Sequence, residues 1–284
     1  MPTSPSPNLG DHVCLLYDQN ADRDSYMGEF VSEGLVAREK VLWVAGGGTP
    51  EVGDLMARRG FDVSEYVDSG QLVVKDRTET YPGSGRFDGE AMLNLVRDEV
   101  RDTEADGDEL RITGELSWAS PGVQGFPELF EYERALDELL RETGHMSVCQ
   151  YDTSQLVPAA LTSAVQAHRS VVSRRSQEVL DTPLLTMLVI TRDSDGVLSL
   201  YGDVDNSNVG EFEAALSAAV SSPGTVTLEL THLHFIDVAG LHVLERQATQ
   251  LSESGDRLVL SSPPAFLKRV LEVLDFDELI EVAE

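Results

Sequence analysis

Short apolar runs alternate with longer amphipathic segments between residues 12 and 152 of this chain. The runs have the length of buried strands and read "HVCLLYD", "KVLWVAG", "QLVVKD", "LRITGEL" and "HMSVCQYD". The segments between them predict helices at residues 23–39, 50–60, 88–103 and 126–143. Strands that alternate with helices of this length form a parallel sheet covered on both faces. We therefore predict a doubly wound α/β domain at residues 10–169.

The pattern changes near residue 184 of the 284, at a length where a second domain is expected. Strands are predicted at 184–193, 197–205, 225–237 and 257–263, and helices at 209–222, 239–255 and 264–276. They form an α/β domain at 184–284 with a four- to five-strand sheet. Residues 170–183, "SVVSRRSQEVLDTP", predict a weakly amphipathic helical connector, and residues 1–9, rich in Pro and Ser, predict a disordered leader.

Acidic residues dominate the charge of the chain. The formal net charge of -29 and the isoelectric point near 4.4 repel nucleic-acid backbones and anionic membranes, so we expect neither as a direct partner. We see no signal peptide and no membrane-spanning apolar run, which predicts a cytoplasmic protein. Cys14 and Cys149 are too few and too far apart in sequence for a disulfide framework or a zinc site, and we expect two buried thiols.

Three C-terminal segments, "GDVD", "LTHLHFIDVAGLHVL" and "SSPPAFLKRVLEVLDFDELIEV", resemble a STAS domain of the anti-sigma factor antagonist type. In that family, a helix that starts after an aspartate carries a phosphorylatable serine. That helix start and the loop after the second strand dock on an anti-sigma factor that is also a serine kinase. The partner-binding residues implied by this resemblance are Asp203, Asp205, Asn206, Ser207, Asp237, Val238, Ala239, Gly240 and Leu241.

Val238 stands where the family has its serine. Because valine has no hydroxyl, we expect that phosphorylation cannot switch the domain off at this position. Asp237 has two open interpretations, a helix N-cap alone or an N-cap that also contacts the partner. The nearby histidines His232, His234 and His242 are a weak zinc pattern, and "DVDNSN" lacks the glycine and glutamate of a calcium loop, so we predict no metal site.

The first domain resembles a MEDS domain, the sensory module named for methanogens, methylotrophs and the regulator of dichloromethane dehalogenation. The resemblance rests on "HVCLLYD", "ARRGFDVSEYVDSGQLVVKD", "YPGSGRFDGEAML", "LRITGELSW" and "FEYERALDELL", and the family is proposed to sense small organic compounds. Its layout is also similar to RecA and KaiC ATPases. The phosphate-binding GxxxxGK[ST] loop is replaced by "DQNADRDS", so we expect a degenerate RecA-like domain without cofactor or catalysis.

Ligands of doubly wound sheets bind at the carboxyl ends of the strands. The candidate ligand-pocket residues are His12, Cys14, Tyr17, Asp18, Arg111, Glu115, Trp118, Tyr151 and Asp152. Arg111 and Glu115 share one strand face, so a structural Arg111–Glu115 network is the alternative to a ligand pocket. Cys14 alternates like a core residue, and His12 is open to a capping or core role.

Together these features favour a signalling protein in which a ligand-sensing MEDS domain controls an anti-sigma factor antagonist-like STAS domain. The expected partner is an anti-sigma factor or another switch protein of the serine-kinase type. A scaffold STAS protein in a larger signalling complex and a cryptic nucleotide-binding enzyme are the alternatives, and the oligomeric state is open.

Overall fold

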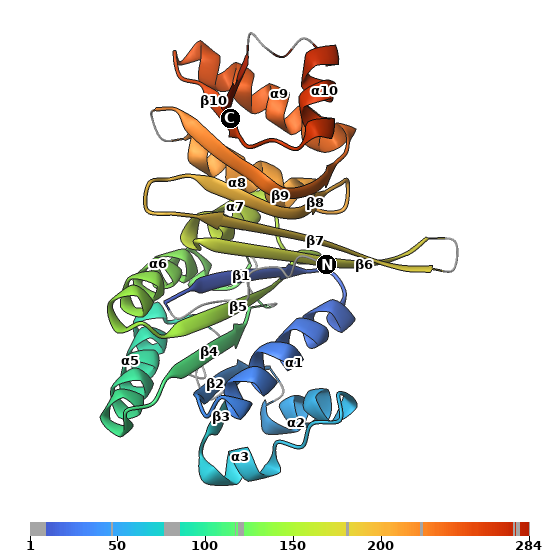
Figure 1. The fold of residues 1–284 in the computed structure, drawn as a ribbon. Helices are drawn as coiled ribbons and strands as arrows, with labels where there is room; N and C mark the ends of the chain where they lie inside the picture. The colour runs from blue at the N-terminus through green and yellow to red at the C-terminus, as the bar shows by residue number, and fades with distance from the viewer. Residues whose placement is uncertain are drawn as a thin grey trace. The chain divides into compact units, whose positions relative to one another are not determined.

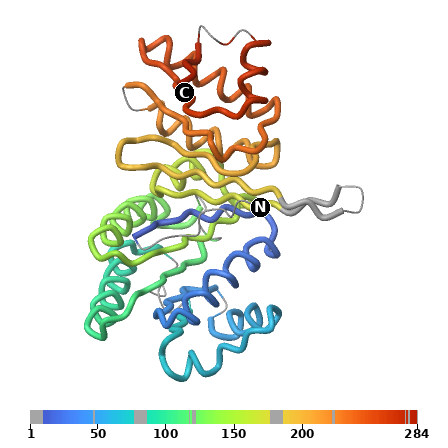
Figure 2. Tube along the Cα trace, in the orientation of Figure 1, coloured from blue at the N-terminus to red at the C-terminus, as the bar shows by residue number. Residues whose placement is uncertain are grey.

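The computed structural model describes residues 10–46, 48–76, 86–116, 118, 122–179, 182–221, 224–274, 276 and 279–283. The predicted leader and residues 180–181 of the predicted connector lie outside this part of the chain. The described residues divide into two compact units, with the boundary between Ala160 and Leu161. Figure 2 shows the course of the chain by colour, from blue in the first unit to red at the end of the second.

The sheet of the first unit is parallel throughout its described part. Its strands are β1 (His12–Tyr17), β2 (Lys40–Ala45), β3 (Leu72–Asp76), β4 (Leu110–Glu115) and β5 (Met146–Asp152). They lie in the order β1-β5-β4-β2-β3. The helices that connect parallel strands cover both faces of the sheet. Strands β1 and β2 are therefore buried along nearly their whole length, which is why they are apolar runs without alternation.

Helices cover both faces of this sheet, which confirms the predicted doubly wound fold (Figure 1). They are α1 (Asn20–Val36), α2 (Gly48–Arg58), α3 (Ser64–Ser69), α5 (Gly89–Asp106) and α6 (Phe126–Thr143). α5 and α6 lie on one face, and α1 and α2 lie on the other (Figure 1). α6 has the predicted limits because Gly125 and Gly144, with φ of 85° and 77°, bound it in the left-handed conformation that glycine adopts readily.

The second unit is a mixed sheet covered by helices. Helix α7 (Pro158–Ala167) crosses the unit boundary. The strands that follow are β6 (Ser170–Val179), β7 (Thr182–Arg192), β8 (Leu198–Val204), β9 (Val226–Ile236), β10 (Leu258–Ser261) and β11 (Ile280–Ala283). They lie in the order β11-β10-β9-β8-β7-β6, so the sheet exceeds the four or five strands that we predicted. Its other helices are α8 (Val209–Val220), α9 (Val238–Glu253) and α10 (Ala265–Leu274).

The predicted helical connector at 170–183 is wrong, because residues 170–179 form strand β6. This strand pairs antiparallel with β7 from Ser170↔Thr191 to Val179↔Thr182. Val171 and Val172 are buried, and β-branched residues pack well on a pleated surface. Arg175 of β6 forms a buried ion pair with Glu211 of α8. The segment is therefore part of the second unit and does not serve as a linker.

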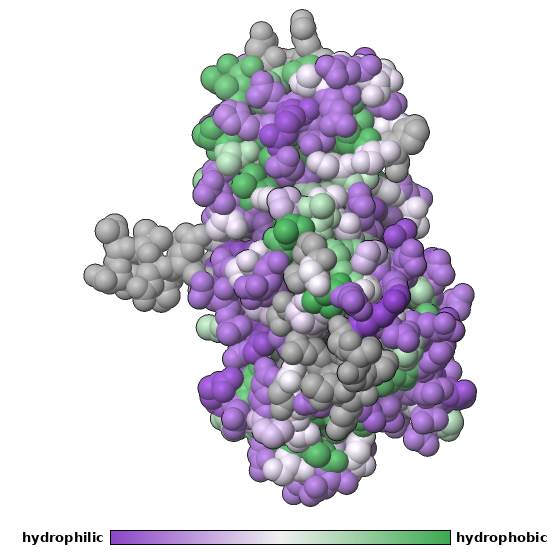
Figure 3. Space-filling model, turned by 180° about the vertical axis from the view of Figure 1, so that it is seen from behind, coloured by the Kyte–Doolittle hydropathy of each residue, from purple (hydrophilic) through white to green (hydrophobic). Residues whose placement is uncertain are grey.

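Hydrophilic side chains predominate on the surface that Figure 3 shows, in agreement with the net charge of -29. Within the described residues, every helix is too short or too polar to cross a bilayer.

Candidate functional site

The start of helix α9 is organised by one carboxylate. Asp237 is the N-cap, and its Oδ1 accepts a hydrogen bond from the Gly240 amide at 2.9 Å. Its Oδ2 accepts a second bond, also 2.9 Å long, from the amide of Asn206. The capping role predicted for Asp237 is confirmed, and the second bond ties the helix start to the loop after β8.

That loop is itself well ordered by side-chain hydrogen bonds. Asp205 Oδ1 accepts bonds from the Ser207 amide at 2.8 Å and the Ser207 hydroxyl at 2.5 Å. Buried Asn208 accepts from the Asp205 amide at 3.0 Å and donates to the Asp203 carbonyl at 2.9 Å. Burial raises the pKa of Asp203. Side chains that turn inward in this way hold the loop in one conformation.

The predicted partner-binding residues surround this helix start, at different depths. Val238 is 65% exposed and Asn206 is also exposed, whereas Gly240 and Leu241 are buried. The remaining five, Asp203, Asp205, Ser207, Asp237 and Ala239, are half-buried. A Cβ on Gly240 would lie 2.6 Å from Ile236 Cγ1 and 2.9 Å from Val204 Cγ1, so a glycine is needed for the close packing of α9 against the sheet.

Sequence reasoning missed Phe235, which is 50% exposed and precedes the helix by three residues. Strict alternation along β9 would bury either His234 or Phe235. The β8–β9 register shifts near this end, after Ser199 and after Gly202, and both His234 and Phe235 are exposed. Phe235 and Val238 together form what we call the apolar pair. The signal available in the sequence was the break in alternation between Leu233 and Ile236.

A small cavity of about 30 Å³ lies in the first unit. Two of the predicted ligand-pocket residues, Glu115 and Trp118, line it. The indole of Trp118 packs 5.3 Å from the ring of Phe87 and donates to the Glu115 carbonyl at 3.1 Å. The full lining consists of Val44, Phe87, Met92, Val96, Ile112, Thr113, Gly114, Glu115, Leu116, Trp118, Tyr132, Ser147 and Cys149.

The other predicted pocket residues are separated by the sheet. His12 and Cys14 are in register with Ser147 and Cys149 of β5, on the face toward α6. Tyr151 is on this face too, and its hydroxyl donates to Glu133 of α6 at 2.6 Å. The guanidinium carbon of Arg23, on α1, lies over the Tyr17 ring, 5.9 Å from the ring centroid. Asp18 is exposed, and Asp152 accepts from the Ser154 amide and hydroxyl.

The alternative of an Arg111–Glu115 network is wrong. Arg111 forms an ion pair with Glu39 and donates to the Phe30 carbonyl at 2.9 Å. Glu115 accepts from the Gly46 amide at 3.1 Å and lies 3.9 Å from Arg23. Residues four apart on a strand are separated by roughly 13 Å, which is why these two charges pair with different neighbours.

Arg23 is the second residue that sequence reasoning missed. It lies at the carboxyl edge of the strands, 2.7 Å from Asp24, 3.5 Å from Glu51 and 3.9 Å from Glu115. Three carboxylates therefore surround one guanidinium at the carboxyl edge of the strands. The excess negative charge there disfavours a triphosphate.

Comparison with known proteins gives two family matches. A model described as MEDS, "MEthanogen/methylotroph, DcmR Sensory domain", matches residues 11–169, which is more than half of the chain. A model described as "Mlab, STAS domain" matches residues 187–281.

Among curated proteins, the transcriptional repressor DcmR of Methylorubrum extorquens is 25% identical over 163 residues, covering 56% of this chain and 58% of that protein. The match therefore spans little more than half the length of the relative. A solved KaiC-like protein of Pyrococcus horikoshii has a TM-score of 0.50 at 17% identity, over 68% of this chain and 85% of its own. The flagellar accessory protein FlaH of Methanocaldococcus jannaschii has a TM-score of 0.47 at 13% identity, over 65% and 78%. The KaiC-like structure shares the fold.

Proposed function

Because the chain belongs to the MEDS family of sensory domains and joins this domain to a STAS domain, we propose that it is a signalling protein that docks on a partner through its STAS domain. The partner is an anti-sigma factor or another switch protein of the serine-kinase type. The MEDS domain supplies the control by binding a small ligand. A relative described as a transcriptional repressor supports a regulatory role.

The observation that carries the docking proposal is the apolar pair beside a preformed helix start. Phe235 and Val238 are 50% and 65% exposed, and Asp237 between them holds both α9 and the loop at Asn206. An ordered backbone lowers the entropy that a binding surface loses on association. Aromatic residues are enriched at the core of protein interfaces, and Phe235 supplies an exposed one here.

Control by phosphorylation is not available at this helix start, because Val238 replaces the serine and the segment Asp237–Val243 contains no Ser or Thr. A phosphate would be compatible with the amides of a helix N-terminus, but it would place about -1.5 to -2 charges next to Phe235. The substitution therefore leaves the apolar pair permanently unmodified, and regulation falls to the MEDS domain.

The volume of the cavity in the first unit limits the size of the ligand that it can hold. A cavity of about 30 Å³ holds roughly two or three water-sized groups. Its lining is mostly apolar, and Trp118, Tyr132 and Ser147 are among the lining residues that carry polar groups. The Glu115 carboxylate is directed at the Gly46 amide and Arg23. We infer a compound of a few heavy atoms with one polar group. The excess of carboxylates around Arg23 disfavours binding of a nucleoside triphosphate at that edge.

The partner is identified by titrating the full chain against each anti-sigma-factor serine kinase encoded in the same genome, with isothermal calorimetry. We expect saturable binding in the micromolar range or tighter to at least one of them, because a standard-size interface gives such affinities. Absence of heat and of co-elution with every member of the panel would refute the proposed function.

A further inference from the structure

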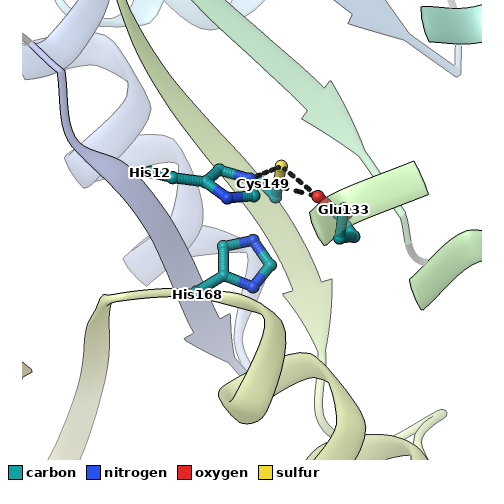
Figure 4. Close-up of side chains that lie close together, drawn as sticks. All are labelled: His12, Glu133, Cys149 and His168. Atoms are coloured by element: carbon teal, nitrogen blue, oxygen red, sulfur yellow. Dashed lines mark hydrogen bonds and ion pairs between the residues drawn. The ribbon is translucent and has the colours of Figure 1, made fainter. Parts of the chain in front are cut away.

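Three buried side chains of the first unit point at one another between the sheet and α6 (Figure 4). His12 is on β1, Cys149 is on β5 and Glu133 is on α6. His12 Nε2 lies 3.1 Å from Glu133 Oε2 and 3.4 Å from Cys149 Sγ, and Cys149 Sγ lies 3.3 Å from Glu133 Oε2. His12 and Glu133 are fully buried and Cys149 is 3% exposed. The fourth side chain drawn, His168, belongs to the second unit, where its Nδ1 lies 2.7 Å from the Ala164 carbonyl oxygen.

These three distances are close to the edges of a tetrahedral zinc site, each about 0.2–0.3 Å shorter than the ideal edge. Zinc binds histidine nitrogen and carboxylate oxygen at about 2.0–2.1 Å and thiolate sulfur at about 2.3 Å, so tetrahedral ligands lie ~3.3 Å apart for N and O and ~3.6 Å apart for S with either. We propose that His12, Glu133 and Cys149 bind a Zn²⁺ ion inside the MEDS domain. The ion takes three protein ligands and keeps one coordination position for water or a small ligand.

Two groups lie behind these ligands, Tyr151 within hydrogen-bond distance and Asp137 beyond it. Tyr151 donates to Glu133 Oε1 at 2.6 Å, which leaves Oε2 directed at the other two ligands. Asp137 Oδ1 lies 3.8 Å from His12 Nδ1, on the opposite edge of the ring from Nε2. A carboxylate behind a histidine ligand and a hydrogen bond to a ligating carboxylate both orient the ligands and increase their basicity.

Zinc binding at this site releases one proton. Zinc takes a neutral imidazole and a thiolate as ligands, so the Cys149 sulfur becomes a thiolate on binding and its proton leaves to solvent.

The alternative without a metal ion is a hydrogen-bonded triangle, in which the thiol and the imidazole N–H both donate to Glu133. The same three distances permit it, and metal content separates the two. We test the proposal with the full chain, produced with added zinc and purified through a tag that contains no histidine. Mass spectrometry of the elements is expected to find about one zinc per chain.

Cys149→Ser is expected to weaken zinc binding by at least roughly a hundredfold, since changes behind the ligands already cost 10- to 100-fold. Cys14→Ser is the matched control, because Cys14 is equally buried and is the β1 partner of Cys149 in register. Its zinc content is expected to equal that of the unchanged chain. Cobalt in place of zinc is expected to give tetrahedral visible bands and a thiolate charge-transfer band, both lost in Cys149→Ser.

If Cys149→Ser does not fold, Glu133→Gln and removal of zinc from the unchanged chain replace it. A chelator is then expected to lower the melting temperature of the unchanged chain and of Cys14→Ser. The proposal is overturned if the purified chain holds no zinc and the metal-free chain binds none in calorimetry. It is also overturned if Cys149→Ser folds and retains zinc as the control does. Partner binding is measured separately, so either result leaves the docking proposal standing.

Discussion

Val238→Asp is expected to weaken binding of the full chain to the proposed kinase partner about a hundredfold, or by ~3 kcal/mol. Val238 is 65% exposed and follows the 50% exposed Phe235 by three residues. The proposed docking would bury it, so the substitution removes an apolar contact worth about 1.5 kcal/mol and forces a carboxylate to lose water without a partner. The measurement is the calorimetric dissociation constant.

The matched control is Val273→Asp, on α10 of the same unit. Val273 is 83% exposed, so the substitution adds the same charge to a helix surface outside the proposed docking site. Its dissociation constant is expected to stay within about twofold of the unchanged chain, as for other surface substitutions. Equal weakening by both variants would mean that the added charge acts through the net charge of the chain and that the apolar pair is not the contact.

Arg175→Met is expected to destabilise the second unit by about 3–5 kcal/mol. Arg175 and Glu211 are each 4% exposed and form an ion pair between β6 and α8. Burial raises the pKa of Glu211, and the Arg175 guanidinium opposes that rise. Removing the guanidinium leaves a buried carboxyl group without its charge partner. Hydrogen exchange of the α8 amides gives the opening free energy that reports this loss.

Two further variants make this test specific. Arg246 and Glu213 form an ion pair at 2.7 Å whose side chains are 54% and 45% exposed, so Arg246→Met is expected to cost less than about 1 kcal/mol. The double variant Arg175→Met, Glu211→Leu is expected to recover most of the lost stability, because no buried charge remains. A loss of the same size in Arg246→Met would show that the buried pair has no special role.

Most elements of the fold could be predicted because local signals and tertiary packing agree. α6 has flanking glycines, a proline at its start and a regular apolar face, and its limits were predicted to the residue. β6 could not be predicted, since "SRRSQE" has the polar composition of a surface helix and its conformation is decided by pairing with β7. The sequence alone predicts that Arg175 is a surface residue. Only the fold shows that it pairs with Glu211, which is 36 residues away.

Only the helix cap could be predicted from one segment. Asp237 was expected to cap α9 because an aspartate directly before a helix is a common N-cap, whereas Val238 was singled out by the resemblance to STAS domains. Glu133 and Arg23 were missed because they reach the strand residues from helices, and no spacing rule connects His12 to Cys149 across 137 positions. The predicted ligand-pocket residues lie on both faces of the sheet, because gathering strand ends by their position in sequence ignores which face each side chain takes.

The most direct test of the central claim is the affinity of the full chain for the proposed kinase partner before and after incubation of the two with ATP. We expect the dissociation constant of the unchanged chain to stay the same, because Val238 offers no hydroxyl at the docking surface. Val238→Ser, which restores one, is expected to become phosphorylated and to bind at least tenfold more weakly. A marked loss of affinity of the unchanged chain after ATP would contradict the claim that its docking surface is free of phosphorylation control.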